Sequence, residues 1–163
     1  MPSMDFLIRP ASASDAEEIS GLITGWAHHY LQDPAPPEAA AFLATLTPSA
    51  TAERIEAPSF RYYVAQGSRG LLGVIALRES SHLYHLFVRA DAHGQGIARA
   101  LWTHAKAKSG SDAFVVNSSL PAVPVYERFG FVARDTPQTK NGLVYVPMEY
   151  VQELKALDVS LQK

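Results

Sequence analysis

The sequence predicts a mixed α/β fold in one domain, and three observations support this. The chain has 163 residues, of which 47% are hydrophobic and 18% charged, and this length suits one compact core. It contains no cysteine, so disulfides cannot replace that core. Strand-like and helix-like hydrophobic patterns alternate along the chain, in the order strand, helix, helical segment, three strands, helix, strand, helix, two strands. We expect one domain over residues 1–163, with its core at about residues 6–150.

The N-terminal part is expected to form a strand and then an amphipathic helix. Residues 6–9 predict the strand, and Pro10 is expected to end it because proline has no amide N–H. Ser14 and Glu17 have the spacing of a helix capping box. Apolar residues then recur at helical spacing and predict one buried face, formed by Ile19, Leu22, Ile23 and Trp26.

A proline-rich segment at residues 28–60 follows this helix. Its prolines leave room for short helices at residues 38–46 and 50–55. The adjacent His28 and His29 are expected to be solvated, since neighbouring helical residues point about 100° apart and no carboxylate lies at metal-ligand spacing. We therefore expect a surface segment draped over the sheet.

The central part predicts a meander of three strands followed by a helix. Residues 61–66 and 71–78 flank a Gly-containing turn, which is typical of a hairpin, and residues 82–88 form the next apolar run. A polar loop then leads to a helix at residues 96–108, which Gly110 is expected to end.

The C-terminal part predicts a strand, a helix and two more strands. Residues 113–117 are apolar and β-branched, as in a buried strand, and a helix starts near Pro121. Residues 131–134 and 143–150 are expected to pair, with a bulge or an edge position at Pro147. The last residues, 151–163, are expected to be a tail or a short helix.

Composition excludes several classes of protein. Fourteen Lys and Arg against sixteen Asp and Glu give a net charge of −2, so we expect no nucleic-acid partner. The absence of cysteine excludes thiolate zinc sites, iron–sulfur clusters and cysteine nucleophiles, and no metal site is predicted. The longest apolar run is far shorter than a membrane-spanning helix. We expect no membrane association and a cytoplasmic location.

The most informative stretch is the predicted strand, loop and helix at residues 83–101. Gly94 and Gly96 lie just before the helix, where free backbone N–H groups and the helix dipole favour a phosphate group. Arg99 stands where a dinucleotide fingerprint needs its third glycine, and the Gly-Lys-Ser/Thr of a P-loop is absent. The simplest alternative is an ordinary tight turn before a helix.

The segment His-Gly-Gln-Gly-Ile-Ala at residues 93–98 resembles the pyrophosphate loop of the GNAT N-acetyltransferase superfamily, Q/R-x-x-G-x-G/A, with His93 replacing Gln or Arg. Residues 117–131 resemble the family's strand, helix and Tyr-x-x-x-Gly-Phe ending. With a matching strand order, the resemblance covers most of residues 6–150. It implies a mostly antiparallel twisted sheet of about seven strands, flanked by helices and splayed between the fourth and fifth strands.

The resemblance also implies an acyltransferase that moves an acetyl group directly from acetyl-CoA to a primary amine. The acceptor amine, of a small molecule or a protein, is not identified by any motif; the resemblance puts its selection in residues 26–63 and the last-strand loop. Residues implied in binding the pantetheine arm and the pyrophosphate of acetyl-CoA are Phe87, Val88, His93, Gly94, Gln95, Gly96, Ile97, Ala98, Arg99 and Asn117. A homodimer formed through the C-terminal strand or tail is compatible with this architecture.

Two catalytic residues are implied by position. Tyr126 corresponds to the acid that protonates the departing thiolate, and His82 corresponds to the base that takes the proton of the amine, with Glu79 as a second candidate. The structural alternatives are a core aromatic for Tyr126 and a surface or hydrogen-bonded strand residue for His82. The alternative function is an acyl-CoA-binding or regulatory domain that has lost the chemistry.

Overall fold

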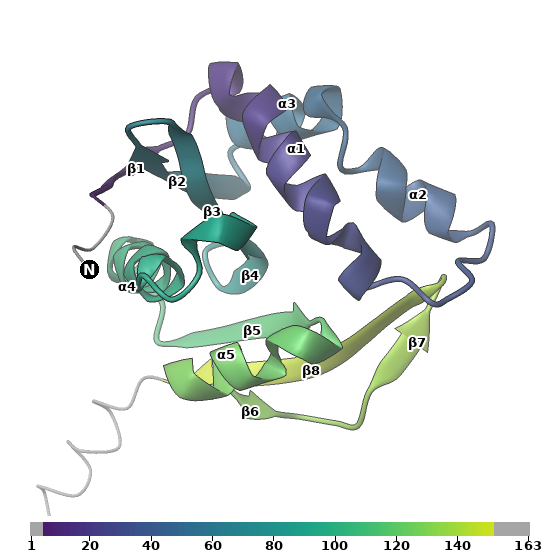
Figure 1. Cartoon of the computed structure of the whole chain (residues 1–163). Coiled ribbons are helices and arrows are strands. Elements are labelled where there is room, and N and C mark those ends of the chain that lie inside the picture. The colour runs from purple at the N-terminus through teal and green to yellow at the C-terminus, as the bar shows by residue number, and fades with distance from the viewer. Residues whose placement is uncertain (1–4, 152–163) are drawn as a thin grey trace, which may run out of the picture.

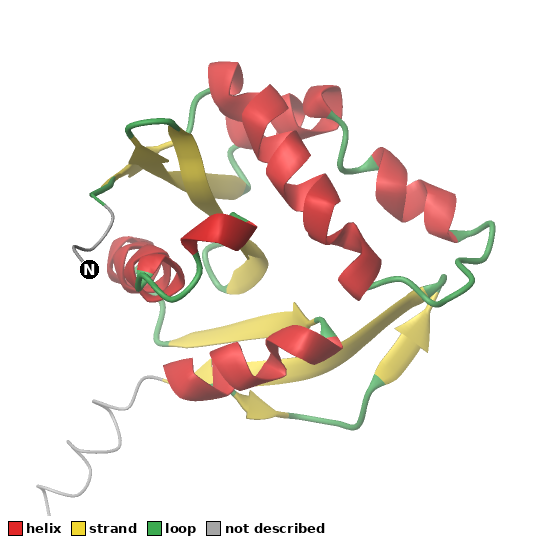
Figure 2. Cartoon of the chain, viewed as in Figure 1, coloured by secondary structure: helices red, strands yellow, loops and turns green. Residues whose placement is uncertain are grey.

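The structure is a computed structural model that describes residues 5–151, and it contains a mixed sheet with helices on both faces (Figures 1 and 2). The strands are β1 (Leu7–Pro10), β2 (Phe60–Gly67), β3 (Gly70–Arg78), β4 (His82–Val88), β5 (Ala113–Ser118), β6 (Val132–Ala133), β7 (Gln138–Lys140) and β8 (Leu143–Val151). The α-helices are α1 (Ala16–Trp26), α2 (Ala39–Ala44), α3 (Pro48–Glu56), α4 (Ile97–Ser109) and α5 (Val123–Phe129). Short 3₁₀ turns are η1 (Ala13–Asp15), η2 (Ala27–His29), η3 (Ala90–Ala92) and η4 (Leu120–Ala122).

The strand order is β1-β2-β3-β4-β5-β8-β6, with β7 paired to β8. The pairs in this sheet are antiparallel except for β4 and β5, which are parallel. The β4–β5 register contains only His82↔Val115 and Leu83↔Val116. A register shift between Ala76 and Leu77 marks an irregularity where β3 meets β4. Beyond Leu83, the edge of β4 that faces β5 therefore has no ladder partner in the described part of the chain.

Two buried clusters fill the two faces of the sheet. One cluster packs α4 and α5 against the sheet and includes Leu101, Trp102 and Phe129. The other packs α1 against the opposite face and includes Ile19 and Ile23. The predicted mixed α/β class, with a mostly antiparallel sheet flanked by helices, is confirmed. The sheet has eight strands where about seven were expected, because β7 adds a short hairpin arm on β8.

Local details of the N-terminal prediction were wrong in an instructive way. The capping box is formed by Ser12 and Asp15, not by Ser14 and Glu17, and η1 precedes α1. Asp15 is preferred because its carboxylate also accepts two hydrogen bonds from Arg9, at 2.8 and 2.9 Å, which fasten the helix start to β1. The expected end of the strand at Pro10 is confirmed: Pro10 is the last residue of β1, in register with Tyr63.

Of the two alternatives predicted at Pro147, the structure shows the edge position: β6 pairs with Met148 and Glu149 and β7 with residues 143–145, so Pro147 lies between these partners on one side of β8. Pro147 pairs with Asn117 within an unshifted β5–β8 register, and its carbonyl accepts a hydrogen bond from the Arg134 amide at 2.8 Å. The ladder passes through it because β6, on the other side, is only two residues long. The predicted tail falls, apart from Val151, outside the described residues. None of the helices in the described part of the chain has the length and apolarity needed to span a bilayer.

Candidate functional site

The loop after β4 presents free backbone amides to solvent. Gly94 and Gly96 both have a φ of +79°, in the left-handed region that glycine adopts without strain. Gly96 is the N-cap of α4, so the first amides of that helix have no partner inside the helix. This end of a 13-residue helix therefore carries several donors and the positive end of the helix dipole.

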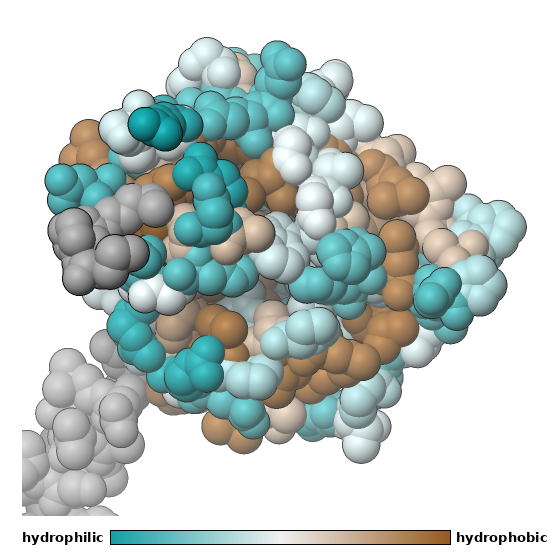
Figure 3. All heavy atoms as spheres, in the orientation of Figure 1, coloured by the Kyte–Doolittle hydropathy of each residue, from teal (hydrophilic) through white to brown (hydrophobic). Residues whose placement is uncertain are grey.

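A cavity of about 600 Å³ opens beside this loop. One wall consists of the end of β4, the glycine loop and the start of α4; a second consists of η4 and α5; a third consists of the end of α1 and the two residues His29 and Tyr30. Hydrophobic side chains gather between α1 and α5 on the face seen in Figure 3. The cavity therefore combines an amide-lined mouth with a largely apolar interior.

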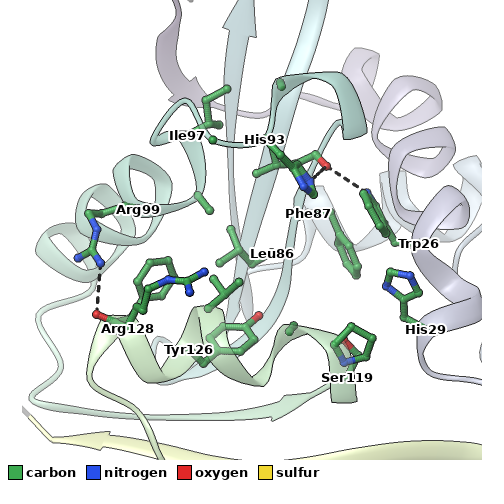
Figure 4. A pocket seen from close by; sticks show the side chains of 18 of the residues that line it. Trp26, His29, Leu86, Phe87, His93, Ile97, Arg99, Ser119, Tyr126 and Arg128 are labelled. Atoms are coloured by element: carbon green, nitrogen blue, oxygen red, sulfur yellow. Dashed lines mark hydrogen bonds between the residues drawn. The ribbon is translucent and has the colours of Figure 1, made fainter. Parts of the chain in front are cut away.

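Tyr126 points its hydroxyl from α5 into this cavity (Figure 4). Burial raises its pKa well above the usual value, and the nearby Tyr30 phenol acts in the same direction. Burial also raises the pKa of Tyr30 to about 12. Both phenols are therefore protonated at neutral pH and can donate hydrogen bonds or protons.

One carbonyl joins the end of α1 to the glycine loop. The Val88 carbonyl accepts a hydrogen bond from Trp26 Nε1 at 3.1 Å and is 2.9 Å from His93 Nε2, which donates when it carries the ring proton (Figure 4). The two rings are stacked, with centroids 5.3 Å apart and planes 10° apart. The His93 side chain thus fixes the loop against β4 and Trp26.

Two arginines lie at the side of the cavity formed by α4 and α5. Arg99 donates from Nη2 to the Arg128 carbonyl at 3.2 Å, and its guanidinium lies 5.2 Å from the centroid of the Phe129 ring. Both arginines line the cavity. They place positive charge near the amide-lined mouth, and nothing in the sequence pattern pointed to Arg128.

The third wall is held in place by bonds to distant strands. The Tyr30 hydroxyl donates to the Asn117 carbonyl at 3.3 Å, and the Val144 amide donates to the Tyr30 carbonyl at 2.7 Å. A Cβ added to Gly142 would meet Pro36 at 2.6 Å, so the turn of the β7–β8 hairpin fits closely against the proline segment. Two strands far apart in sequence, β5 and β8, therefore position Tyr30.

Most of the residues predicted for the site surround this cavity. Those that line it are Phe87, Val88, His93, Gly94, Gly96, Ile97, Ala98, Arg99 and Tyr126. Three do not. Gln95 lies in the loop without lining the cavity, Asn117 has an exposed side chain, and His82 lies at the paired start of β4.

His82 is separated from the cavity by most of a strand. It precedes Leu86, the β4 residue nearest to it that lines the cavity, by four residues, or about 13 Å along an extended chain. Its Nδ1 lies 3.4 Å from Arg78 Nη2, and burial, with the charge of Arg78, lowers its pKa. Its role as a base therefore remains a prediction from sequence position.

Sequence reasoning did not assign many of the residues that line the cavity, among them Trp26, His29, Ser119 and Arg128. The expectation that both members of the histidine pair are solvated was wrong for His29, which is half-buried and lines the cavity, while His28 is exposed. For Trp26 and His29, their place in the sequence could have indicated this, since Trp26 is the last residue of α1 and His29 follows it by three residues. The direction of each ring depends on η2, which the sequence pattern did not predict.

The sequence matches the family model of the acetyltransferase (GNAT) domain over residues 30–152. No curated protein gives a significant match to the sequence. Similar solved structures include a GCN5-related N-acetyltransferase from Rhodopseudomonas palustris, with a TM-score of 0.72 and 19% identity over 93% of this chain and 98% of that one. PaiA N-acetyltransferase from Thermoplasma acidophilum, in complex with coenzyme A, has a TM-score of 0.72 and 17% identity, covering 91% and 99%. The spermidine N-acetyltransferase SpeG from Vibrio cholerae has a TM-score of 0.63 and 18% identity, covering 91% and 94%.

Proposed function

Because the chain belongs to the GNAT acetyltransferase family, we propose that it is an acetyl-CoA-dependent N-acetyltransferase that transfers the acetyl group directly to a primary amine. One observation carries this proposal. The amide-lined start of α4 and the Tyr126 hydroxyl belong to the same cavity, with the unpaired edge of β4 leading from one to the other. A phosphate-bearing thioester needs these features: an anion site, an extended channel and a proton donor.

In this proposal the pyrophosphate lies on the amides of residues 95–98, with Arg99 and Arg128 supplying charge. The pantetheine arm runs along β4, in the gap left where β4 and β5 stop pairing. Val88 is the better candidate for its backbone contact, through its N–H: its carbonyl already meets Trp26 and His93 on the open edge of β4, whereas Phe87 pairs with Val74 and its carbonyl faces β3, 3.0 Å from the Cβ position of Gly73. The roles given to Gln95 and Asn117 are weaker, because neither lines the cavity.

Tyr126 is the proposed acid. As the carbon–sulfur bond of the thioester breaks, the phenol gives its proton to the departing sulfur. The raised pKa of Tyr126 keeps this proton in place at neutral pH. No covalent enzyme intermediate is required, because the chain has no cysteine and the acceptor nitrogen can attack the thioester itself.

The experiment is acetyl-CoA-dependent thiol release with a panel of amines: spermidine, lysine amide, phenethylamine and aniline. Tyr126→Phe is expected to lower turnover about 100-fold, with the dissociation constant of acetyl-CoA changed less than threefold. Tyr63→Phe is the matched control, since Tyr63 is a buried phenol outside the cavity. Equal turnover of Tyr126→Phe and the wild type would exclude the acid role.

The second candidate is a domain that binds acyl-CoA without catalysis. It shares the anion site and the channel, so binding alone does not separate the two functions. Calorimetry with acetyl-CoA and thermal stabilisation give the binding result. Acetyl-CoA binding without thiol release for any amine of the panel would favour the binding domain over the enzyme.

A further inference from the structure

His29 occupies a wall of the cavity that the proposed mechanism has not yet used. It is the last residue of η2, and its ring is packed against Trp26 at 4.9 Å and against His28 at 4.2 Å between centroids. In Figure 4 it lies below Trp26, on the side of the cavity opposite Arg128 and Tyr126. No hydrogen bond to another described residue engages either ring nitrogen.

The cavity offers few other proton acceptors. Among the described residues that line it there is no aspartate or glutamate. Tyr30 and Tyr126 keep their protons because burial raises the pKa of both. Arg99 and Arg128 are guanidinium ions, which do not give up their protons in proteins. His93 is the other imidazole of the cavity: when its Nε2 donates to the Val88 carbonyl, its Nδ1 is the acceptor, but the ring is held against Trp26 on the side of the glycine loop.

We propose that His29 is the base that removes the proton from the acceptor amine, an inference that rests on the proposed acetyl transfer. Alkyl amines are ammonium ions at neutral pH and cannot attack a thioester until one proton has left. His29 takes that proton and passes it to solvent. The nitrogen then attacks the carbonyl carbon and the carbon–sulfur bond breaks. The nitrogen loses its second proton to solvent, and the Tyr126 phenolate, which has given its proton to the sulfur, takes one proton back from solvent, so no net proton is lost in this step.

The surroundings of His29 favour its neutral form. Burial is the main cause of its lowered pKa, and the charge of the adjacent His28 acts in the same direction. His93 lies on the other side of Trp26, and Arg99, Arg128 and the two phenols face the same cavity. Cations oppose protonation of the ring, and no lining carboxylate favours it. A neutral imidazole at cellular pH can accept a proton.

His29 and His82 are therefore alternative bases. His82 has the position that the family resemblance implies, but it lies where β4 and β5 are paired. His29 has no counterpart in that motif, but it lines the cavity together with Tyr126. A base must reach the nitrogen directly or through one water, and His29 meets this condition for an amine held in the cavity.

The experiment compares His29→Gln, His28→Gln and His82→Gln by thiol release, using the alkyl amine of the panel that the wild type acetylates fastest, and aniline. Glutamine keeps polar contacts but cannot accept the proton. His29→Gln is expected to lower kcat for the alkyl amine about 100-fold and to remove the acid limb of the pH profile. With aniline, which is uncharged at neutral pH, the loss should stay below threefold. His28→Gln, the matched exposed neighbour, should stay within twofold of the wild type.

Measurements of acetyl-CoA binding and of the histidine titration by NMR distinguish a failure of the inference from a failure of the proposed function. Unchanged acetyl-CoA affinity in His29→Gln shows that the fold and the cofactor site are intact. Loss of the acid limb in His82→Gln and not in His29→Gln would overturn the inference, while thiol release would still support the proposed function. Absence of thiol release from the wild type would overturn the proposed function itself. Independently of any acceptor, a ring titration with coenzyme A bound that leaves His29 protonated at pH 7.5 would overturn the inference.

Discussion

Two walls of one cavity are built in opposite ways. The wall of the proposed cofactor site is one continuous stretch, residues 86–99, whose shape is set by backbone angles at Gly94 and Gly96. The wall of the proposed acceptor site, residues 26–30, is held by side-chain and backbone bonds to three distant strands. A locally encoded wall can be recognised from a motif, and a wall assembled by tertiary contacts cannot.

This difference predicts how each wall fails. A wall shaped by backbone angles should be most sensitive where a residue must adopt a positive φ. A wall held by single hydrogen bonds should lose about 1 kcal/mol with each bond removed. Substitutions in the glycine loop should mainly raise the dissociation constant of acetyl-CoA. Substitutions that remove a hydrogen bond of residues 26–30 should have smaller effects, divided between acetyl-CoA affinity, the rate with the acceptor amine and the free energy of unfolding.

The largest expected effect is at Gly96. Gly96→Val forces a β-branched residue to adopt a φ of +79°, which costs roughly 2 kcal/mol, and it puts a side chain among the amides of the phosphate site. If the loop keeps its shape, the valine side chain lies among the amides that would bind the pyrophosphate; if the loop moves, these amides are displaced. Either outcome weakens acetyl-CoA binding. Calorimetry should show the dissociation constant raised at least about tenfold.

Gly110→Val is a matched control for this change. Gly110 ends the same helix with a φ of +75°, and an added Cβ meets no atom within 4 Å at either glycine. Both substitutions should therefore lower the free energy of unfolding by similar amounts. If Gly110→Val weakens acetyl-CoA binding as much as Gly96→Val does, the effect comes from general destabilisation and the local account of this wall is wrong.

The same division explains what the sequence could and could not predict of the fold. Regular patterns identified β2, β3, β4 and α4 to within about one residue at each end. The capping box was misplaced because the competition between Asp15 and Glu17 is decided by Arg9, a contact across β1. Strand β7 was missed because Gln138–Lys140 has no apolar alternation and exists as a strand only through its pairing with β8.

For the candidate site, the motif located the loop, the helix start and Tyr126, since these are linked to local turn chemistry. It gave no information on Trp26, whose indole donates to a carbonyl 62 residues away in sequence. His29 was misjudged because helical geometry alone does not say what a ring faces. The residues that select an acceptor are therefore those that a single sequence predicts least well.

A second test uses acid to destabilise the fold at His85, a buried residue of β4. His85 is 7% exposed, lies against Tyr62 and Tyr84, and has an Nε2 without a hydrogen-bond partner. Burial lowers its pKa to about 3. The unfolded chain therefore binds a proton below pH 6.5 that the folded chain does not, and stability falls with pH from that point down to about pH 3.

Urea unfolding should measure this loss between pH 7 and pH 5, where it amounts to about 2 kcal/mol for one such group. His29 and His82, whose pKa values are also lowered, add in the same direction. His85→Leu should remove most of the pH dependence whatever its effect at pH 7, because only the slope is compared. The ion pair of Asp15, whose pKa is lowered by Arg9, is lost only at more acid pH. An unchanged slope in His85→Leu would assign the acid sensitivity to other groups.

The smallest expected effect comes from the bond that joins the two walls. Trp26→Phe keeps an aromatic ring beside His93 but removes the donor to the Val88 carbonyl, which retains its contact with His93. Tyr30→Phe is the matched change. It also removes one hydrogen bond from the same wall, but this bond goes to Asn117 of β5, whereas the bond of Trp26 goes to β4. Each should cost about 1 kcal/mol of unfolding free energy. Only Trp26→Phe should weaken acetyl-CoA binding, about threefold to fivefold by calorimetry, because its bond reaches the cofactor wall. Equal acetyl-CoA affinities in the two variants would mean that the walls act independently, and that Trp26 serves only to shape the acceptor side.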